Sequence, residues 1–180
     1  YRVHGRQARR WTEQARARQD ALAELLVDAV EGGASVNFVR PMTPAKAALW
    51  WEGALASHAR GERLILTAEA DGRLDGTVQL VPAPQENQPH RADIAKMLVH
   101  RRARRQGLGA TLLHAAEAQA RRLGRTLLTL DTEAGSEGER FYARMGWIRF
   151  GQVPGYATRA DGGGREAATF FYRTLEQPDR

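Results

Sequence analysis

Residues 101–111, "RRARRQGLGAT", decide how this 180-residue chain is interpreted. An apolar run ending at Val99 precedes them, and a strongly amphipathic helix pattern follows. Gly107 and Gly109 at the helix start would let a phosphate approach the backbone, where free N–H groups and the positive end of the helix dipole attract anions. The four arginines would equally suit a nucleic-acid backbone. The stretch therefore predicts either a phosphate-binding loop or a basic strip.

The flanking sequence predicts a single α/β (α+β) domain over residues 1–180. Helical spacing covers 12–30, 44–60, 106–124 and 135–146, with Thr12 as a cap of the first helix. Strand patterns cover 63–70, 75–82, 91–100, 125–131, 147–153 and 166–175, hairpin signals lie at 71–76, and 154–165 is expected to be a long loop. A hairpin meander followed by a strand–helix–strand crossover predicts a mixed sheet with helices on its faces.

The composition excludes several classes of function. The chain has no cysteine and its five histidines lack metal-ligand spacing, so we expect no disulfide, thiolate site or metal. No apolar run is long enough to span a bilayer and no signal-peptide pattern opens the chain, so we expect a cytoplasmic protein with no membrane partner. The net charge of +6 favours anionic ligands. The absence of aromatic residues from 101–124 argues against nucleic acid as a partner.

Gly107 and Gly109 do not match two of the known phosphate-binding glycine motifs. The P-loop needs Lys-Ser or Lys-Thr after its last glycine, and the dinucleotide fingerprint needs a third glycine, so neither fits. Arg104-x-x-Gly107-x-Gly109, five residues past Val99, resembles the pyrophosphate loop of the GNAT superfamily of N-acetyltransferases. "ERFYARMGWIRFG", residues 139–151, is similar to that superfamily's Phe-Tyr-x-x-x-Gly-Phe segment, with tryptophan in place of the last phenylalanine.

Within that superfamily, three phrases resemble the tabtoxin-resistance acetyltransferases: "GGASVNF" (32–38), "LDTEAGSEGERFY" (130–142) and "VPGYATRADG" (153–162). Arg101 and Arg105 depart from the superfamily's usual proline and glycine. Gly135 and Gly138 replace residues that are often asparagine and alanine. The resemblance implies the GNAT fold, a mixed, mostly antiparallel sheet of six to seven strands with helices on both faces.

The resemblance also implies a function. It points to transfer of an acetyl group from acetyl-CoA to the primary amine of a small molecule, such as an amino-acid-like β-lactam toxin. Direct transfer in a ternary complex is expected, because no cysteine is available for an acyl-enzyme. A polyamine, an antibiotic or a protein N-terminus are alternative acceptors, and a basic nucleic-acid-binding module is the rival from another class. The state expected is monomer or homodimer.

The implied cofactor site combines the strand and the loop. Its residues are Met97, Leu98, Val99, Arg104, Arg105, Gln106, Gly107, Leu108, Gly109, Ala110 and Thr111. Strand alternation predicts one shared face for Asp93, Ala95, Met97 and Val99.

The candidate catalytic residues are Tyr142, Asp131 and Asp93. Tyr142 matches the superfamily's thiolate-protonating tyrosine, although a Phe-Tyr pair at a helix end also suits core packing. Asp131 and Asp93 are candidate bases, with a water relay or Glu133 as alternatives. Asp131 could instead cap a helix, and Asp93 could pair with Arg91 or Lys96. The acceptor-pocket candidates are Ser35, Asn37, Trp50 and Tyr156, and of Trp50 and Trp51 at least one is expected to pack on the core.

Overall fold

The computed structural model of the protein describes residues 2–4 and 14–176. Its helices are α1 (Gln14–Glu31), α2 (Pro44–Ala59), α3 (Leu108–Arg122) and α4 (Glu137–Arg144), with a short 3-10 turn, η2, at Arg101–Ala103. Its strands are β1 (Arg2–His4), β2 (Leu64–Ala70), β3 (Arg73–Pro82), β4 (Arg91–Val99), β5 (Leu127–Glu133), β6 (Ile148–Thr158) and β7 (Arg165–Thr174). They form one sheet in the order β1-β2-β3-β4-β5-β7-β6.

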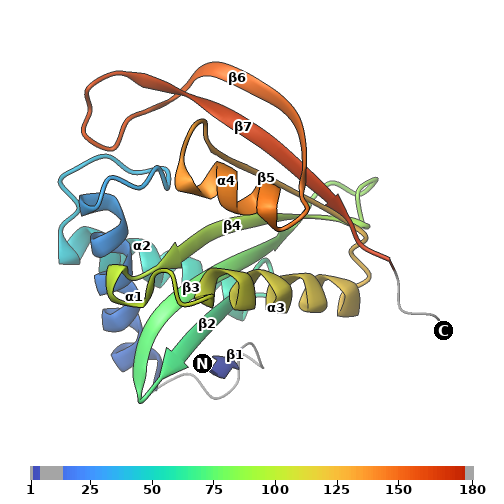
Figure 1. Ribbon diagram of the computed structural model, residues 1–180. Helices are drawn as coiled ribbons and strands as arrows, with labels where there is room; N and C mark the ends of the chain where they lie inside the picture. The colour runs from blue at the N-terminus through green and yellow to red at the C-terminus, as the bar shows by residue number, and fades with distance from the viewer. Residues whose placement is uncertain (1, 5–13, 177–180) are drawn as a thin grey trace.

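The sheet is mixed and mostly antiparallel, as predicted. Every neighbouring pair of strands is antiparallel except β4 and β5, which are parallel. A parallel pair needs a long crossover connection, and here α3 provides it. In Figure 1 the strands β5, β7 and β6 spread away from β4. The helices α3 and α4 lie on one face of the sheet, and α1 and α2 lie on the other. The predicted cap Thr12 lies outside the described residues.

The predicted loop over 154–165 is wrong in its first part. β6 continues to Thr158, which pairs with Arg165 of β7. A register shift between Val153 and Ala157 accommodates Pro154, which has no N–H for the ladder. The true turn is short, and the Asp161 carboxylate accepts a hydrogen bond from Gly163 N at 2.8 Å within it.

Each face of the sheet has its own hydrophobic core. On one face Leu112 and Leu113 of α3, both fully buried, pack with the strands and with Tyr142 of α4. On the other face Leu22 of α1 and Trp51 of α2 are fully buried against the strands. Burying apolar surface on both sides fixes the strand positions, including the two strands that separate at the site.

A β-bulge in β4 reverses its side-chain alternation. The register shifts between Thr77 and Gln79 of β3, and Lys96 opposite them has a left-handed backbone, with φ of 49°. The extra residue turns Met97 and Val99 toward α3 and α4, whereas Leu98 packs toward α1 and α2. The prediction of one shared face was therefore wrong for Asp93, Ala95, Met97 and Val99. Simple alternation fails because a bulge puts two residues opposite one.

β4 and β5 separate soon after they meet. Their pairing runs from Arg91 and Leu127 to Asp93 and Thr129. β4 then continues to Val99, and β5 pairs on its other side with β7 as far as Glu133. The two strands diverge like the arms of a V, which leaves room between them for ligand atoms.

Candidate active site

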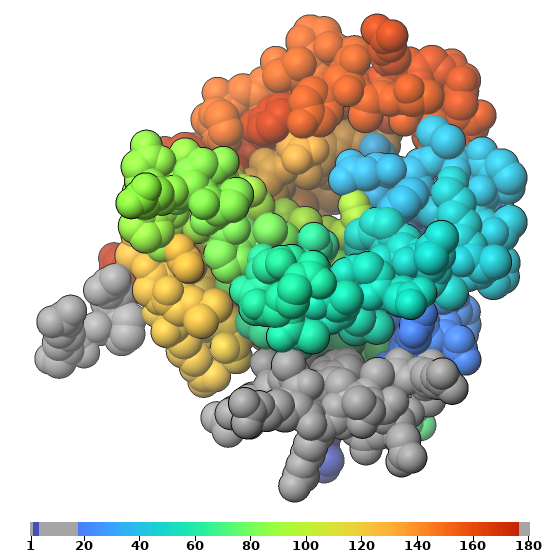
Figure 2. Space-filling model, turned by 180° about the vertical axis from the view of Figure 1, so that it is seen from behind, coloured from blue at the N-terminus to red at the C-terminus, as the bar shows by residue number. Residues whose placement is uncertain are grey.

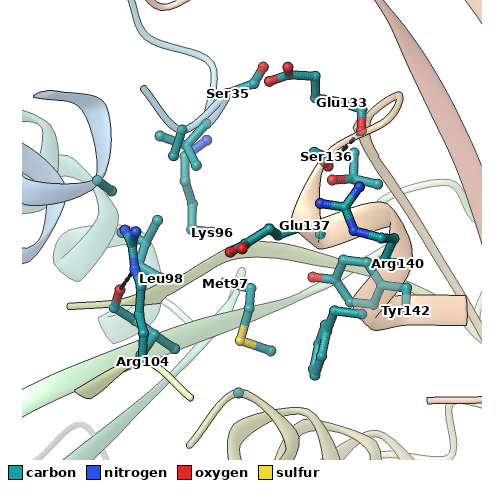
Figure 3. Close-up of a pocket in the computed structure, with 18 of the residues that line it drawn as sticks. Ser35, Lys96, Met97, Leu98, Arg104, Glu133, Ser136, Glu137, Arg140 and Tyr142 are labelled. Atoms are coloured by element: carbon teal, nitrogen blue, oxygen red, sulfur yellow. Dashed lines mark hydrogen bonds between the residues drawn. The ribbon is translucent and has the colours of Figure 1, made fainter. Parts of the chain in front are cut away.

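A cavity of about 880 Å³ lies where β4 and β5 diverge. Its walls come from the segment after α1, the second half of β4, the loop before α3, the end of β5 and the α4 helix. In the space-filling view the molecule is hollowed between the orange β6–β7 hairpin and the light-blue segment that joins α1 to α2 (Figure 2). Figure 3 shows the side chains that line the cavity.

One end of the cavity is built to receive an anion. Gly107, the N-cap residue of α3, has a left-handed conformation, with φ of 78°, and Thr111 N donates to the Gly107 carbonyl at 3.1 Å. The N–H groups of the first helical turn therefore point toward the cavity end, at the positive end of the helix dipole. Arg104 and Arg105, which precede Gly107 in the chain, also line the cavity. Such an arrangement suits a phosphate or pyrophosphate.

Two further arginines line this cavity that were not predicted from the sequence. Arg140 and Arg144 lie on successive turns of α4 and line the cavity opposite the glycine loop. Arg140 also donates to the Gly135 carbonyl at 2.8 Å. Spacing four residues apart on a short helix gives a common face, but nothing in the sequence showed which face that was.

The other arginines of the 101–105 stretch hold the fold together. Arg101 pairs with the Asp28 carboxylate of α1. Arg102 donates to Asp75, whose side chain is fully buried, at 2.6 Å and to Glu24 at 2.8 Å. Half of the predicted basic strip is thus neutralised internally, which weakens the nucleic-acid interpretation.

The cavity includes most of the predicted cofactor residues. The lining includes Met97, Leu98, Val99, Arg104, Arg105, Gly107, Leu108, Gly109 and Ala110. In the described part of the chain, Gln106 and Thr111 are not among the lining residues. Gln106 donates to the Arg102 carbonyl at 3.2 Å, and the Thr111 hydroxyl donates to the Gly107 carbonyl at 3.3 Å. Both side chains hold the loop rather than reach into the cavity.

The two candidate bases have different surroundings. Asp131 lines the cavity, whereas Asp93 lies outside the lining and accepts from Arg91 at 2.6 Å and from the Thr129 hydroxyl. The alternative that Asp93 pairs with Arg91 is confirmed. Burial chiefly, and the Asp93 charge in addition, raise the pKa of Asp131 above its ordinary value, while Lys96 opposes this. A raised pKa makes the Asp131 carboxylate a better proton acceptor.

The helix-cap interpretation of Asp131 is wrong. Ser136 caps α4: its hydroxyl accepts from Glu139 N at 3.1 Å, and Glu139 reaches back to Gly135 N. The Ser136 bond is half of a capping box, and Glu139 binds the N–H of the residue before the cap instead of that of the cap itself. Asp131 is therefore left available to the cavity.

Tyr142 packs in the core and also lines the cavity. Its ring packs edge-on against Phe141 at 5.1 Å and Trp147 at 5.8 Å between ring centroids. Its hydroxyl points into the cavity above Met97 (Figure 3). Burial chiefly, with the Asp131 charge, raises the pKa of Tyr142, so its hydroxyl stays protonated and can donate.

The acceptor-side candidates are divided. Ser35 and Asn37 line the cavity, while Trp50 and Tyr156 are not among its lining residues in the described chain. Tyr156 packs edge-on against Phe170 at 5.3 Å on the outer hairpin.

The two adjacent tryptophans lie as expected, with Trp51 fully buried in the core. Trp50 contacts the Phe38 ring at 5.6 Å between centroids. Lys96 lines the cavity beside the rings of Phe38 and Trp50. The sequence had suggested it only as a possible partner for Asp93.

Glu133 is a further acidic group of the cavity. It is the last residue of β5, and its carboxyl is close to that of Glu166 on β7. Burial chiefly, together with the hydrogen bond and charge of Glu166, raises the pKa of Glu133, and Arg159 opposes this. Glu133 therefore remains a candidate proton acceptor, as the sequence suggested.

Comparisons with known proteins agree with this fold and site. The family described as "Acetyltransferase (GNAT) family" matches residues 20–147. An uncharacterised N-acetyltransferase in the hisH-hisA intergenic region of Azospirillum brasilense is 32% identical over 112 residues, covering 61% of this chain and 65% of that protein. The match thus spans less than two thirds of that relative.

Two solved structures are similar over almost the whole chain. Ribosomal-protein-alanine N-acetyltransferase from Brucella melitensis has a TM-score of 0.76 at 22% identity, covering 97% of this chain and 100% of that one. YncA from Salmonella typhimurium, a structure with its cofactor acetyl-CoA, has a TM-score of 0.75 at 18% identity, covering 99% and 96%. At these identities the likeness establishes the fold.

The fold is that of the N-acetyltransferase superfamily, with a sheet that diverges between β4 and β5. The chain belongs to the acetyltransferase (GNAT) family. In the described residues, no helix combines the length and apolarity that crossing a membrane requires. The same residues contain no group of three or more acidic or histidine side chains arranged to hold a metal.

Proposed function

We propose that the chain transfers an acetyl group from acetyl-CoA to the primary amine of a small molecule. The observation that carries this proposal is the cavity between β4 and β5. One end offers a helix N-terminus and arginines, and the middle holds the Asp131 carboxylate and the Tyr142 hydroxyl. A phosphate-bearing donor and an amine acceptor can therefore meet inside one cavity.

The residues present fit acetyl-CoA. Gly107 begins α3 at the cavity end, and a side chain at Gly107 would extend into open space, with no protein atom within 4 Å. The N–H groups of the loop would bind the pyrophosphate, and Arg104, Arg105 and Arg140 would add positive charge. The backbone of Met97–Val99, which does not pair with β5, would hold the pantetheine arm and the acetyl carbonyl.

Acetyl-CoA, when bound, supplies a thioester whose carbonyl carbon accepts the amine. Asp131 would take the proton of the acceptor ammonium, because its carboxylate faces the cavity and its pKa is raised. A bond then forms from the amine nitrogen to the acetyl carbon, and the carbon–sulfur bond breaks. Tyr142 would donate its hydroxyl proton to the departing sulfur, and the second proton that the nitrogen loses on becoming an amide would restore the Tyr142 hydroxyl. No covalent acetyl-enzyme is needed, so transfer is direct within a ternary complex.

The acceptor would be an amino-acid-like amine, with a β-lactam toxin as one member of that class. Support comes from the three phrases shared with the tabtoxin-resistance acetyltransferases. Two of those phrases contribute Ser35, Asn37 and Asp131 to the cavity lining. The Brucella neighbour's name concerns a ribosomal-protein alanine, and a protein N-terminus is therefore the competing acceptor.

Calorimetric titration of acetyl-CoA at about 0.15 M salt tests the cofactor site, because that salt level screens nonspecific charge attraction. We expect one-to-one binding that Gly107→Glu weakens at least about tenfold, since the carboxylate would repel the pyrophosphate. Gly124→Glu is the matched control. Gly124 also has a left-handed backbone, with φ of 67° against 78°, and open space around its Cβ, but it follows the opposite end of α3.

Equal effects of the two substitutions would show that strain, and not the phosphate site, weakens binding. No binding to the wild-type chain would refute the proposed function. With binding established, release of the free CoA thiol in the presence of a panel of amines then measures transfer itself.

A further inference from the structure

Lys96 lines the cavity from β4. The β-bulge gives Lys96 a left-handed backbone and sends its side chain from β4 toward the segment that carries Ser35 (Figure 3). Its ammonium lies over the rings of Phe38, at 5.4 Å from the centroid, and Trp50, at 5.5 Å. These two rings hold the charged group at one wall of the cavity.

No carboxylate among the described residues forms an ion pair with the Lys96 ammonium. Within residues 2–4 and 14–176 it makes neither a hydrogen bond nor an ion pair, although the side chain is mostly buried. Burial chiefly lowers the pKa of Lys96 to about 8; the charge of Asp131 opposes this shift, and the charge of Arg63 adds to it. Proteins rarely keep a buried cation without a partner unless a ligand supplies the counter-charge.

The other side of the opening carries the complementary charge. β4 and β5 stop pairing at Asp93 and Thr129, so Lys96 and Asp131 lie on opposite arms of the V. Their charges influence each other, yet no ion pair closes the gap between them. A molecule that bears an ammonium and a carboxylate close together would satisfy both arms at once.

We propose that Lys96 binds a carboxylate of the acetyl acceptor and thereby selects amino acids and their analogues over polyamines and protein N-termini. This inference rests on the proposed function. The acceptor's amine lies at Asp131 and its carboxylate at Lys96, so both groups are fixed relative to the thioester. An acceptor without the carboxylate leaves the Lys96 cation unpaired. A polyamine brings a second cation toward it.

The test compares free amino acids with their carboxamides, which differ only in the negative charge. Putrescine and spermidine serve as acceptors with no carboxylate. We expect the wild-type chain to acetylate at least one amino acid with a kcat/KM about tenfold or more above that of its amide. Lys96→Met lowers kcat/KM for the acid about tenfold to a hundredfold, mainly through KM, and leaves the amide unchanged.

Lys46→Met is the matched control, because Lys46 is the only other lysine of the sequence and its side chain is exposed on α2. It removes the same charge and leaves both substrates unchanged. Lys96→Arg keeps the charge and retains most of the preference for the acid. A wild-type preference for amides or polyamines, or an equal loss for acid and amide in Lys96→Met, would overturn the proposal.

A binding measurement separates this proposal from the proposed function. In protein with isotope-labelled lysine, two side-chain signals report the pKa values of Lys46 and Lys96. Adding the amino acids in the panel is expected to raise the pKa of Lys96 and not that of Lys46. This pKa shift is expected even if no acetyl transfer is found. If only the transfer reaction fails, the pKa shift still decides whether Lys96 binds the carboxylate. No shift with any acid in the panel would overturn the role of Lys96.

Discussion

Replacing Lys96 with methionine is expected to stabilise the folded chain at neutral pH. The ordinary pKa of 10.5 falls to about 8 in the folded protein, chiefly through burial. At 1.36 kcal/mol per pKa unit, that difference corresponds to a cost of about 3 kcal/mol for keeping the ammonium charged. Methionine keeps the length and packs well on aromatic rings. The substitution also loses two cation–π contacts worth about 0.5 kcal/mol each, so the expected net gain is about 2 kcal/mol.

The gain depends on pH with a defined sign. Below a pH of about 8 the lysine is charged in both the folded and the unfolded chain, and the full cost is present. Between about 8 and 10.5 the unfolded chain binds more protons than the folded chain, so the wild-type free energy of unfolding rises with pH. The wild type is expected to recover about 2 kcal/mol between about pH 7 and pH 9.5, which removes the advantage of the variant.

Urea unfolding followed by circular dichroism measures this difference. With a slope of about 2 kcal/mol per molar urea, Lys96→Met should raise the midpoint by about 1 M at about pH 7 and by almost nothing at about pH 9.5. Lys46→Met, an exposed control on α2, should leave the midpoint unchanged at both pH values. A variant less stable than the wild type at neutral pH, or an advantage that is equal at both pH values, would refute the reasoning. Lower stability retained in the native sequence is typical of a residue kept for function.

Three further substitutions test the site and the fold. Asp131→Asn is expected to lower kcat/KM by about a hundredfold or more and to abolish the acidic limb of the pH–rate profile. That limb arises because activity falls as pH drops through the raised pKa of Asp131, and an unchanged limb would assign it to another base. Tyr142→Phe removes only the hydroxyl and is expected to lower kcat about a hundredfold with native circular dichroism; a wild-type kcat would leave Tyr142 with its packing contacts alone. Leu112→Ala empties a fully buried position of α3 and is expected to cost about 3 kcal/mol in urea unfolding, whereas a loss below about 1 kcal/mol would show that the core collapses around it.

Local patterns were enough to predict most of the elements. The amphipathic stretch 106–124 predicted α3, and the pattern of Gly107 and Gly109 pointed to the loop that lines the cavity before it. These features depend on residues close in the sequence, where helical spacing and glycine conformation dominate. The register of strand pairing was harder to predict from the sequence. Pro154 suggested a loop, but the β6–β7 pairing outweighs one missing N–H by shifting register around it.

Some residues of the site could be predicted from the sequence, and others depend on long-range packing. Resemblance singled out Asp131 and Tyr142, and the structure brings both into the cavity. Asp93 looked equivalent to Asp131, but Arg91 two residues away pairs with it. Arg140 and Arg144 gave no signal, because exposed arginines on a short helix are common and their direction depends on how α4 docks.

The sequence by itself determined the order of elements, the glycine loop and the membership of a family, because each is written in a contiguous stretch of chain. Only the tertiary structure decided the surroundings of Lys96. Its bulged backbone arises from the pairing of β3 with β4, and its aromatic neighbours, Phe38 and Trp50, come from a loop and a helix more than forty residues earlier. Burial of a charge depends on all the elements that surround it, so no local pattern in the sequence could report that cost.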